Sequence, residues 1–196
     1  AIDYPEDLDI HIGRAILHSE TGVDLIGANR RLADAAARLQ IMQMSQYNAV
    51  GDAECSCETV MATLLLPLRS AYDYIIIDCG SYIANDILSA VALMEADSIL
   101  RLANCDPKSV NYFASQLPLL DGPEWDMDKQ YKVAANVKPF QAADHIGKVL
   151  GDTAFVLPYS QELEEQYLAG NLLADLTLKD SRPFRKELER IIAEVF

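Results

Sequence analysis

The sequence contains no apolar run of about 18 or more residues, the length that a helix needs to cross a membrane. The start of the chain, AIDYPED, also lacks the basic and apolar regions of a secretory signal peptide. Both absences predict a cytoplasmic protein without a membrane span.

Basic residues are scarce. The chain has 16 lysines and arginines against 30 aspartates and glutamates, which gives a formal net charge of −14 at pH 7. A surface of this sign repels the phosphate backbone of nucleic acids and the headgroups of anionic lipids. The charge therefore argues against direct DNA binding.

Cysteine and histidine are few and are not spaced as metal ligands. The cysteines are Cys55, Cys57, Cys79 and Cys105, and the C-x-C spacing of the first two fits neither a zinc site nor a redox C-x-x-C motif. The 3 histidines have no ligand spacing with acids or cysteines. We expect reduced, structural thiols.

The remaining composition is that of an ordinary globular protein, with 51% hydrophobic and 23% charged residues. A length of 196 residues suits one domain with a sizeable core. We predict a single α/β domain over residues 1–196.

The most informative segment is residues 72–80, with the sequence YDYIIIDCG. Two tyrosines lead into three consecutive isoleucines, and the run stops at Asp78. Such a run is typical of a strand buried on both faces of a parallel sheet, and open parallel sheets bind ligands beyond the carboxyl ends of their strands. Asp78 is therefore a candidate site residue. The alternative, which the pattern leaves open, is that Asp78 caps the next helix.

Helical and strand patterns alternate along the chain. Apolar periodicity and capping residues predict helices over about 8–18, 30–42, 61–68, 87–94, 106–120, 162–169 and 184–196, and strands over about 23–26, 74–78, 96–102, 130–136 and 153–157. This order makes right-handed parallel crossovers the default. The predicted fold is a doubly wound, mostly parallel sheet flanked by helices, with an amphipathic closing helix that docks on it.

Four segments, in order, resemble the ParA/MinD family of deviant P-loop ATPases. Residues 21–33, TGVDLIGANRRLA, resemble an upstream family segment, and residues 72–78 resemble its Walker B strand. Residues 133–137, VAANV, resemble the adenine-side strand that ends in Asn, and residues 157–165, LPYSQELEE, resemble a late Ile-Pro-Tyr turn and helix. The resemblance implies an incomplete P-loop NTPase-like domain.

The resemblance also implies roles for four residues. Asp78 would act in catalysis by orienting the water shell of a nucleotide-bound Mg²⁺, which makes it the expected metal residue as well. Asn136, Pro158 and Tyr159 would hold the adenine, since an Asn side chain offers both a donor and an acceptor. For the intact protein the expected cofactor is ATP or ADP with Mg²⁺, and the expected assembly is a homodimer.

The chain departs from the family pattern in two places. It contains no G-x-x-x-x-G-K-[ST] loop, and Gly147-Lys148-Val149 lacks both the hydroxyl and the preceding glycines. Residues 78–82, DCGSY, replace the usual Asp-Thr-Pro-Pro-Gly. We expect the phosphate-loop strand and helix upstream of this sequence, and a parent protein that is an ATPase although these residues alone are inactive.

Two functions follow from these observations. The first is the bulk of an ATP-binding ATPase domain that acts as a nucleotide-dependent dimerisation switch in partition, segregation or protein positioning. The second is a noncatalytic relative, similar to the CpaE/TadZ branch, that acts as a dimerising scaffold and binds partners.

Overall fold

The computed structural model describes residues 15–20, 22–26, 65–79, 87–120, 126–139, 151–170 and 173–196. The chain divides into two units, residues 1–95 and 96–196, and each is described by itself. The helix predicted over residues 30–42 lies outside the described residues, and one domain over residues 1–196 stays a prediction.

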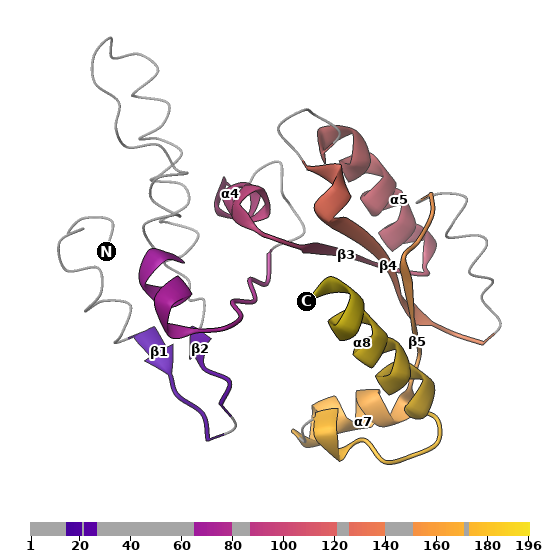
Figure 1. The fold of residues 1–196 in the computed structure, drawn as a ribbon. Coiled ribbons are helices and arrows are strands. Elements are labelled where there is room, and N and C mark those ends of the chain that lie inside the picture. Colours follow the sequence, from indigo (N-terminus) through magenta and orange to yellow (C-terminus); the bar gives the residue numbers. More distant parts are fainter. Residues whose placement is uncertain are drawn as a thin grey trace, which may run out of the picture. The chain divides into compact units, whose positions relative to one another are not determined.

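The second unit is built on a three-stranded parallel sheet (Figure 1). Its strands are β3 (Ile99–Asn104), β4 (Gln130–Val137) and β5 (Phe155–Pro158), in that order across the sheet. The middle strand β4 is buried on both faces, with Val133 1% and Ala134 0% exposed. Small and β-branched residues suit this position because helices press on both sides. The parallel sheet confirms the predicted fold class.

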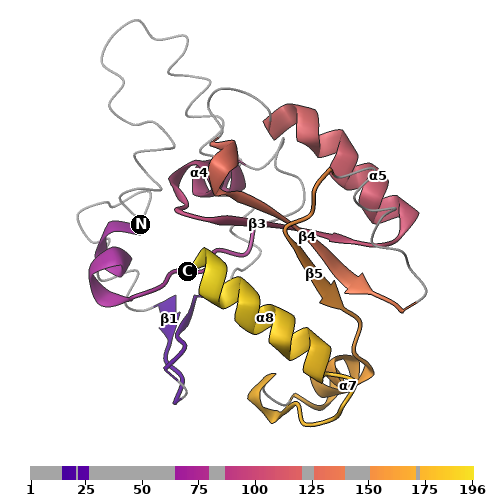
Figure 2. The same ribbon diagram turned by 45° about the vertical axis from the view of Figure 1, so that its right-hand side comes forward.

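Two helices cover opposite faces of this sheet (Figures 1 and 2). In α5 (Pro107–Gln116), Phe113 packs in a cluster with Ala103 and Ala134, whereas α8 (Arg182–Val195) contributes Ile191 to a cluster with Val133 and Phe155. Because Val133 and Ala134 are consecutive residues of one strand, their side chains point to opposite faces. The closing helix therefore docks on the sheet, as predicted.

Local sequence signals set the ends of the helices in this unit. Asp106 caps α5 by accepting the Ser109 N–H at 2.9 Å, and Pro107 occupies the first turn, where its missing N–H costs nothing. The helix passes into the 3₁₀ turn η3 (Leu117–Leu120), which contains Pro118. α7 (Gln161–Ala169) ends at Gly170, whose φ of 72° suits glycine. Short 3₁₀ turns, η4 (Met127–Lys129) and η5 (Leu173–Asp175), complete the unit.

Side chains of α8 cover the free edge of β5. Glu187 Oε1 accepts the Val156 N–H at 3.0 Å, and Arg190 Nη2 donates to the Ala154 carbonyl at 3.0 Å. The last residue of the strand, Pro158, has no N–H to present. An open strand edge is a template for pairing with another chain, and these three residues remove most of that template.

In the part that the structure describes, the first unit holds a short hairpin and two helices. β1 (Ile16–Leu17) pairs antiparallel with β2 (Leu25–Ile26), so Ile16 and Leu17 form a strand where the sequence predicted the end of a helix. Pairing with Leu25 and Ile26 overrides the local helical pattern of these residues, and the apolar spacing in the sequence does not reveal that pairing. The strand predicted at residues 23–26 is confirmed for Leu25 and Ile26, and the helix predicted around Ile87 is confirmed as α4 (Ile87–Glu95). No described helix has the length and apolar character needed to cross a membrane.

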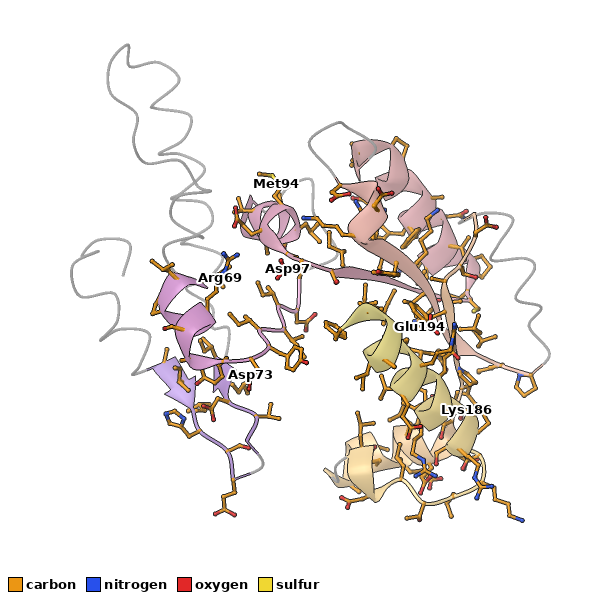
Figure 3. The ribbon with its side chains drawn as sticks, viewed as in Figure 1. Arg69, Asp73, Met94, Asp97, Lys186 and Glu194 are labelled. Atoms are coloured by element: carbon orange, nitrogen blue, oxygen red, sulfur yellow. The ribbon has the colours of Figure 1, made fainter. Side chains whose placement is uncertain are left out.

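A second helix of this unit covers residues 65–71. Arg69 on this helix lies 3.5 Å from Glu95 Oε2 of α4 (Arg69 is labelled in Figure 3). The hairpin residue Asp24 accepts the Tyr72 hydroxyl at 2.6 Å and lies 2.9 Å from His18 Nδ1. The Tyr72 hydroxyl, followed by His18, lowers the pKa of Asp24. The hairpin creates this histidine–acid contact, which the sequence spacing did not indicate.

Residues 74–79 correct the central expectation from the sequence. They form no strand, and Ile76 is 87% and Tyr74 68% exposed, whereas the triple isoleucine predicted a strand buried on both faces. A β-branched run favours a strand only when a neighbouring strand supplies hydrogen bonds and a cover. The two strands that the structure describes in this unit, β1 and β2, pair with each other instead.

Adjacent isoleucines of α8 provide a matched test of the packing in the second unit. Ile191 is 3% exposed and Ile192 is 55% exposed. We expect Ile191→Ala to lower the free energy of unfolding by about 2 to 5 kcal/mol, because it leaves a cavity against the sheet. Ile192→Ala should change it by no more than about 0.5 kcal/mol. Urea denaturation of both variants measures this, and equal costs would contradict the docking of α8 through Ile191.

Candidate functional site

The carboxyl ends of β4 and β5 bring together three of the four site residues that the sequence predicted. Val137 pairs with Pro158 in the sheet, and the Tyr159 N–H donates to the Val137 carbonyl at 2.9 Å. Asn136 is the residue before Val137. Asn136, Pro158 and Tyr159 thus lie on neighbouring strand ends at one edge of the sheet, where open α/β sheets bind ligands.

Asn136 has an unusual backbone. Its φ of 55° lies in the left-handed region, and it is the one non-glycine residue with positive φ in the described part of the chain. The register between β4 and β5 shifts between Ala134 and Val137, so Asn136 lies in a bulge. Asn tolerates this conformation better than most residues. The bulge interrupts the alternation of the strand and leaves Asn136 exposed at the edge of the sheet.

Tyr159 is fixed at both ends. Its backbone N–H is bonded to Val137, and its hydroxyl donates to Glu164 Oε2 at 3.0 Å, a bond that raises the pKa of Tyr159. The ammonium of Lys138 lies 5.3 Å from the centroid of the Tyr159 ring, within the range of a cation–π interaction. The sequence reasoning missed Lys138. The one feature of the sequence that could have indicated Lys138 is its position as a basic residue directly after the strand that carries Asn136.

The helix after this turn has its amino end filled by carboxylates of the chain itself. Ser160 accepts the Leu163 N–H at 3.3 Å as N-cap of α7, and Asp180 Oδ2 accepts the N–H groups of Gln161 at 2.9 Å and Glu162 at 3.2 Å. These bonds, that from Glu162 foremost, hold the pKa of Asp180 below its ordinary value. The amino end of α7 is therefore satisfied internally and does not present its N–H groups to a ligand.

Glu162 makes the reciprocal contact. Its carboxylate accepts the N–H groups of Thr177 at 2.7 Å and Leu178 at 2.9 Å. Glu162 therefore binds the segment that leads to α8. Two sets of hydrogen bonds therefore connect the start of α7 to the residues before α8: those accepted by Asp180 and those accepted by Glu162.

An open groove of about 690 Å³ lies on the outer side of β5. Its lining comprises Val156, Pro158, Pro183, Lys186, Glu187, Glu189 and Arg190 (Lys186 is labelled in Figure 3). Of the three residues predicted to hold the base, Pro158 lines this groove, and Asn136 and Tyr159 do not. Its Glu187 and Arg190 are already bonded to the edge of β5.

Asp78 belongs to the first unit, and the other three predicted site residues belong to the second. Its side chain is exposed at the end of the segment 74–79. Residues 80–86 lie outside the described residues, so both interpretations of Asp78, site residue and helix cap, stay predictions. Among the described residues, no group of three or more His, Cys, Asp or Glu could hold a metal ion.

Comparisons with known proteins agree with this geometry. A family model described as AAA domain, AAA_31, matches residues 8–117, which is more than half of the chain. Among solved structures, a ParA family ATPase from Chlorobium tepidum TLS superposes with a TM-score of 0.69 at 17% identity, covering 99% of this chain and 74% of that one. No curated protein matches the sequence.

A second solved structure with the same fold is an ATP complex of a McdA variant from Cyanothece. Its TM-score is 0.66 at 19% identity, and the match covers 94% of this chain and 74% of that one. Together with the parallel sheet, these matches define the class as an α/β domain with an incomplete P-loop NTPase-like fold. The chain belongs to the AAA domain family whose model matches it, and its fold is like that of the ParA family ATPase and the McdA variant.

The contacts of Asp180 predict a pH-dependent contribution to stability. An aspartate with a lowered folded-state pKa stabilises the fold above its ordinary pKa of 3.8, and this contribution is lost as the pH falls through the lower folded-state value. We expect Asp180→Asn to be less stable than the wild type near neutral pH, and the difference to shrink as the pH falls below about 4.

Denaturation at a series of pH values measures this difference. Asp152→Asn serves as the control, because Asp152 is exposed and lies outside the α7 contacts. A difference between wild type and Asp180→Asn that does not change with pH would contradict the role assigned to the carboxylate.

Proposed function

We propose that this chain is the nucleotide-binding part of an ATPase domain of ParA type, in which Asn136, Pro158 and Tyr159 hold the base and Asp78 serves the metal. The observation that carries the proposal is the pairing of β4 with β5, which puts Asn136 beside the Pro158-Tyr159 turn. The Cyanothece relative of the same fold is an ATP complex, which supports ATP as the nucleotide.

The residues at the end of the sheet fit a purine base. The exposed amide of Asn136 offers a donor and an acceptor to the base edge. Pro158 and the fixed ring of Tyr159 offer apolar surface next to it, since Tyr159 cannot swing away without breaking its bond to Glu164. The pairing of β4 with β5 holds the backbone of these residues in place before any ligand binds, which lowers the entropic cost of binding.

Asp78 fits Mg²⁺ in a specific way. This ion keeps several waters and is held by one or two carboxylates together with substrate phosphates. A single exposed aspartate therefore suffices to orient the hydrated ion, and the lack of a larger acidic group among the described residues does not conflict with this role. When bound, Mg²⁺ would neutralise phosphate charge. Asp78 would accept hydrogen bonds from its waters.

The wider role that we propose is a switch. Nucleotide binding would join two copies of the domain, and hydrolysis or release would separate them, as part of partition, segregation or positioning. Each copy has a net charge of −14, so two copies repel each other. In such a dimer, a bound metal ion or the segments that carry the basic residues would offset this repulsion.

One sequence feature favours the alternative, a noncatalytic scaffold. Residues 78–82, DCGSY, do not carry the family pattern after the metal aspartate, and the 196 residues contain no lysine-bearing phosphate loop. A scaffold would dimerise without nucleotide. Analytical ultracentrifugation with and without ATP and Mg²⁺ separates the two, because only the switch gains dimer on adding nucleotide.

The metal role of Asp78 is tested by ATP binding. Titration of a fluorescent ATP analogue in the presence of Mg²⁺ should show that Asp78→Asn weakens binding by about tenfold, the usual cost of removing a group that orients metal-bound water. Asp73→Asn is the matched control, since Asp73 is also an exposed aspartate and lies within residues 72–80 (labelled in Figure 3). Equal effects of the two variants would contradict the assignment to Asp78.

Turnover is a separate expectation. These 196 residues contain no phosphate loop with a lysine that would neutralise the transferred phosphate. They should therefore hydrolyse ATP at a rate not distinguishable from the background. Phosphate release measured with Mg²⁺ present checks this, and Mg²⁺-dependent turnover that Asp78→Asn abolishes would overturn it.

A further inference from the structure

Two helices begin next to the strand ends that carry the proposed base site. α7 follows Tyr159 directly, with Ser160 as its N-cap. α5 begins just after β3, and Cys105, which precedes it, donates to the carbonyl of Ala135, the residue before Asn136, at 3.6 Å. The amino end of a helix commonly binds phosphate, because its first N–H groups have no partner within the helix. The partners of these N–H groups therefore decide whether a phosphate can bind beside the base.

The start of α5 is already occupied by a carboxylate of the chain. Asp106 accepts the Ser109 N–H at 2.9 Å and the Ser109 hydroxyl at 2.6 Å, and its carbonyl accepts the Val110 N–H at 3.0 Å. Pro107 has no N–H to donate. Hydrogen bonds from the Ser109 side chain, followed by those from the backbone of Ser109 and Lys108, hold the pKa of Asp106 below its ordinary value. This carboxylate is therefore ionised at neutral pH.

The start of α7 is filled in the same way. Asp180 Oδ2 accepts the first two N–H groups, those of Gln161 at 2.9 Å and Glu162 at 3.2 Å. The next two are donated to the hydroxyl and the carbonyl of the N-cap Ser160, at 3.3 Å and 3.4 Å. All four N–H groups at the start of α7 thus have partners within the chain.

These contacts treat the two parts of a nucleotide differently. The base meets the amide of Asn136 and the apolar surface of Pro158 and Tyr159, as proposed above. A phosphate that extends toward either helix meets the ionised Asp106 or Asp180 instead of free N–H groups, and each aspartate already makes the favourable interaction that the helix offers to an anion. The strand ends therefore favour the uncharged part of the ligand.

We infer that the ends of β4 and β5 select the nucleoside part of a purine nucleotide, and that Asp106 and Asp180 are specificity-determining residues that keep phosphates from the starts of α5 and α7. Phosphates then add affinity only through Mg²⁺ at Asp78. This inference rests on the proposed function, because it names the part of the ligand that the same site binds.

The test compares adenosine with ATP in the absence of Mg²⁺. Equilibrium dialysis of the 196-residue chain in excess EDTA should show that ATP binds no more tightly than adenosine. Asp106→Gly frees the Ser109 N–H, and glycine is itself tolerated as an N-cap, so α5 should still form. Its ATP affinity should rise about two- to fivefold, the usual gain from an anion at the amino end of a helix, with adenosine unchanged.

Two further variants test the second helix and the effect of charge alone. Asp180→Ala frees two N–H groups of α7 and should raise ATP affinity in the same way. Asp97→Asn removes a negative charge just before the amino end of β3, at the opposite edge of the sheet (Asp97 is labelled in Figure 3). It should leave both affinities unchanged. Circular dichroism shows whether each variant is folded.

The other outcomes separate this inference from the proposed function. ATP that binds more tightly than adenosine in EDTA, for example through the ammonium of Lys138 near Tyr159, overturns the inference, while the proposed function stands. A folded Asp106→Gly with unchanged ATP affinity also overturns it, as does binding of ATP with Mg²⁺ but not of adenosine. A chain that binds neither ligand, with or without Mg²⁺, overturns the proposed function and this inference with it.

Discussion

The arrangement at the carboxyl ends of β4 and β5 depends on the hydrogen bond from the Tyr159 N–H to the Val137 carbonyl. This bond closes the pairing of β4 with β5 after the register shift, and the shift is what turns Asn136 out of the strand. The pairing is stable because Val133 and Ala134 are buried between helices on both faces. The hydrophobic core thus decides where the polar residues at the edge of the sheet lie.

Several acidic residues serve the structure rather than a ligand. Asp180 caps α7, Glu162 holds the backbone before α8, Glu187 covers the edge of β5, and Asp24 joins the hairpin to Tyr72. Each accepts hydrogen bonds from groups that would otherwise lose water without compensation. These carboxylates keep their negative charge while they stabilise the fold, so they still contribute to the net charge of −14.

Much of the second unit could be predicted from the sequence. Residues 130–137 are a buried strand, Asp106 and Pro107 begin a helix, and Gly170 ends one, because these signals act over a few residues. The triple isoleucine was different. It predicted a buried strand, but burial and pairing are supplied by distant segments, and residues 74–78 are exposed and residues 74–79 form no strand.

The candidate site was predictable to the same extent. Asn136, Pro158 and Tyr159 stand at strand ends, which periodicity can locate, and the structure brings them together. Lys138 and Asp180 were not found, since their contacts join residues about 20 positions apart that no local pattern connects. Asp78 could be proposed only from the family resemblance and the strand-end rule, and its role stays a prediction.

The bulge at Asn136 affects how related sequences are to be compared. A left-handed backbone admits Gly, Asn and Asp far more readily than β-branched residues, so the main chain alone restricts this position. An asparagine in the same column of an alignment therefore reports the bend of the strand as much as any ligand. Glycine in that column would keep the bend and remove the amide, so relatives that carry it would retain the shape of the strand end without this polar side chain.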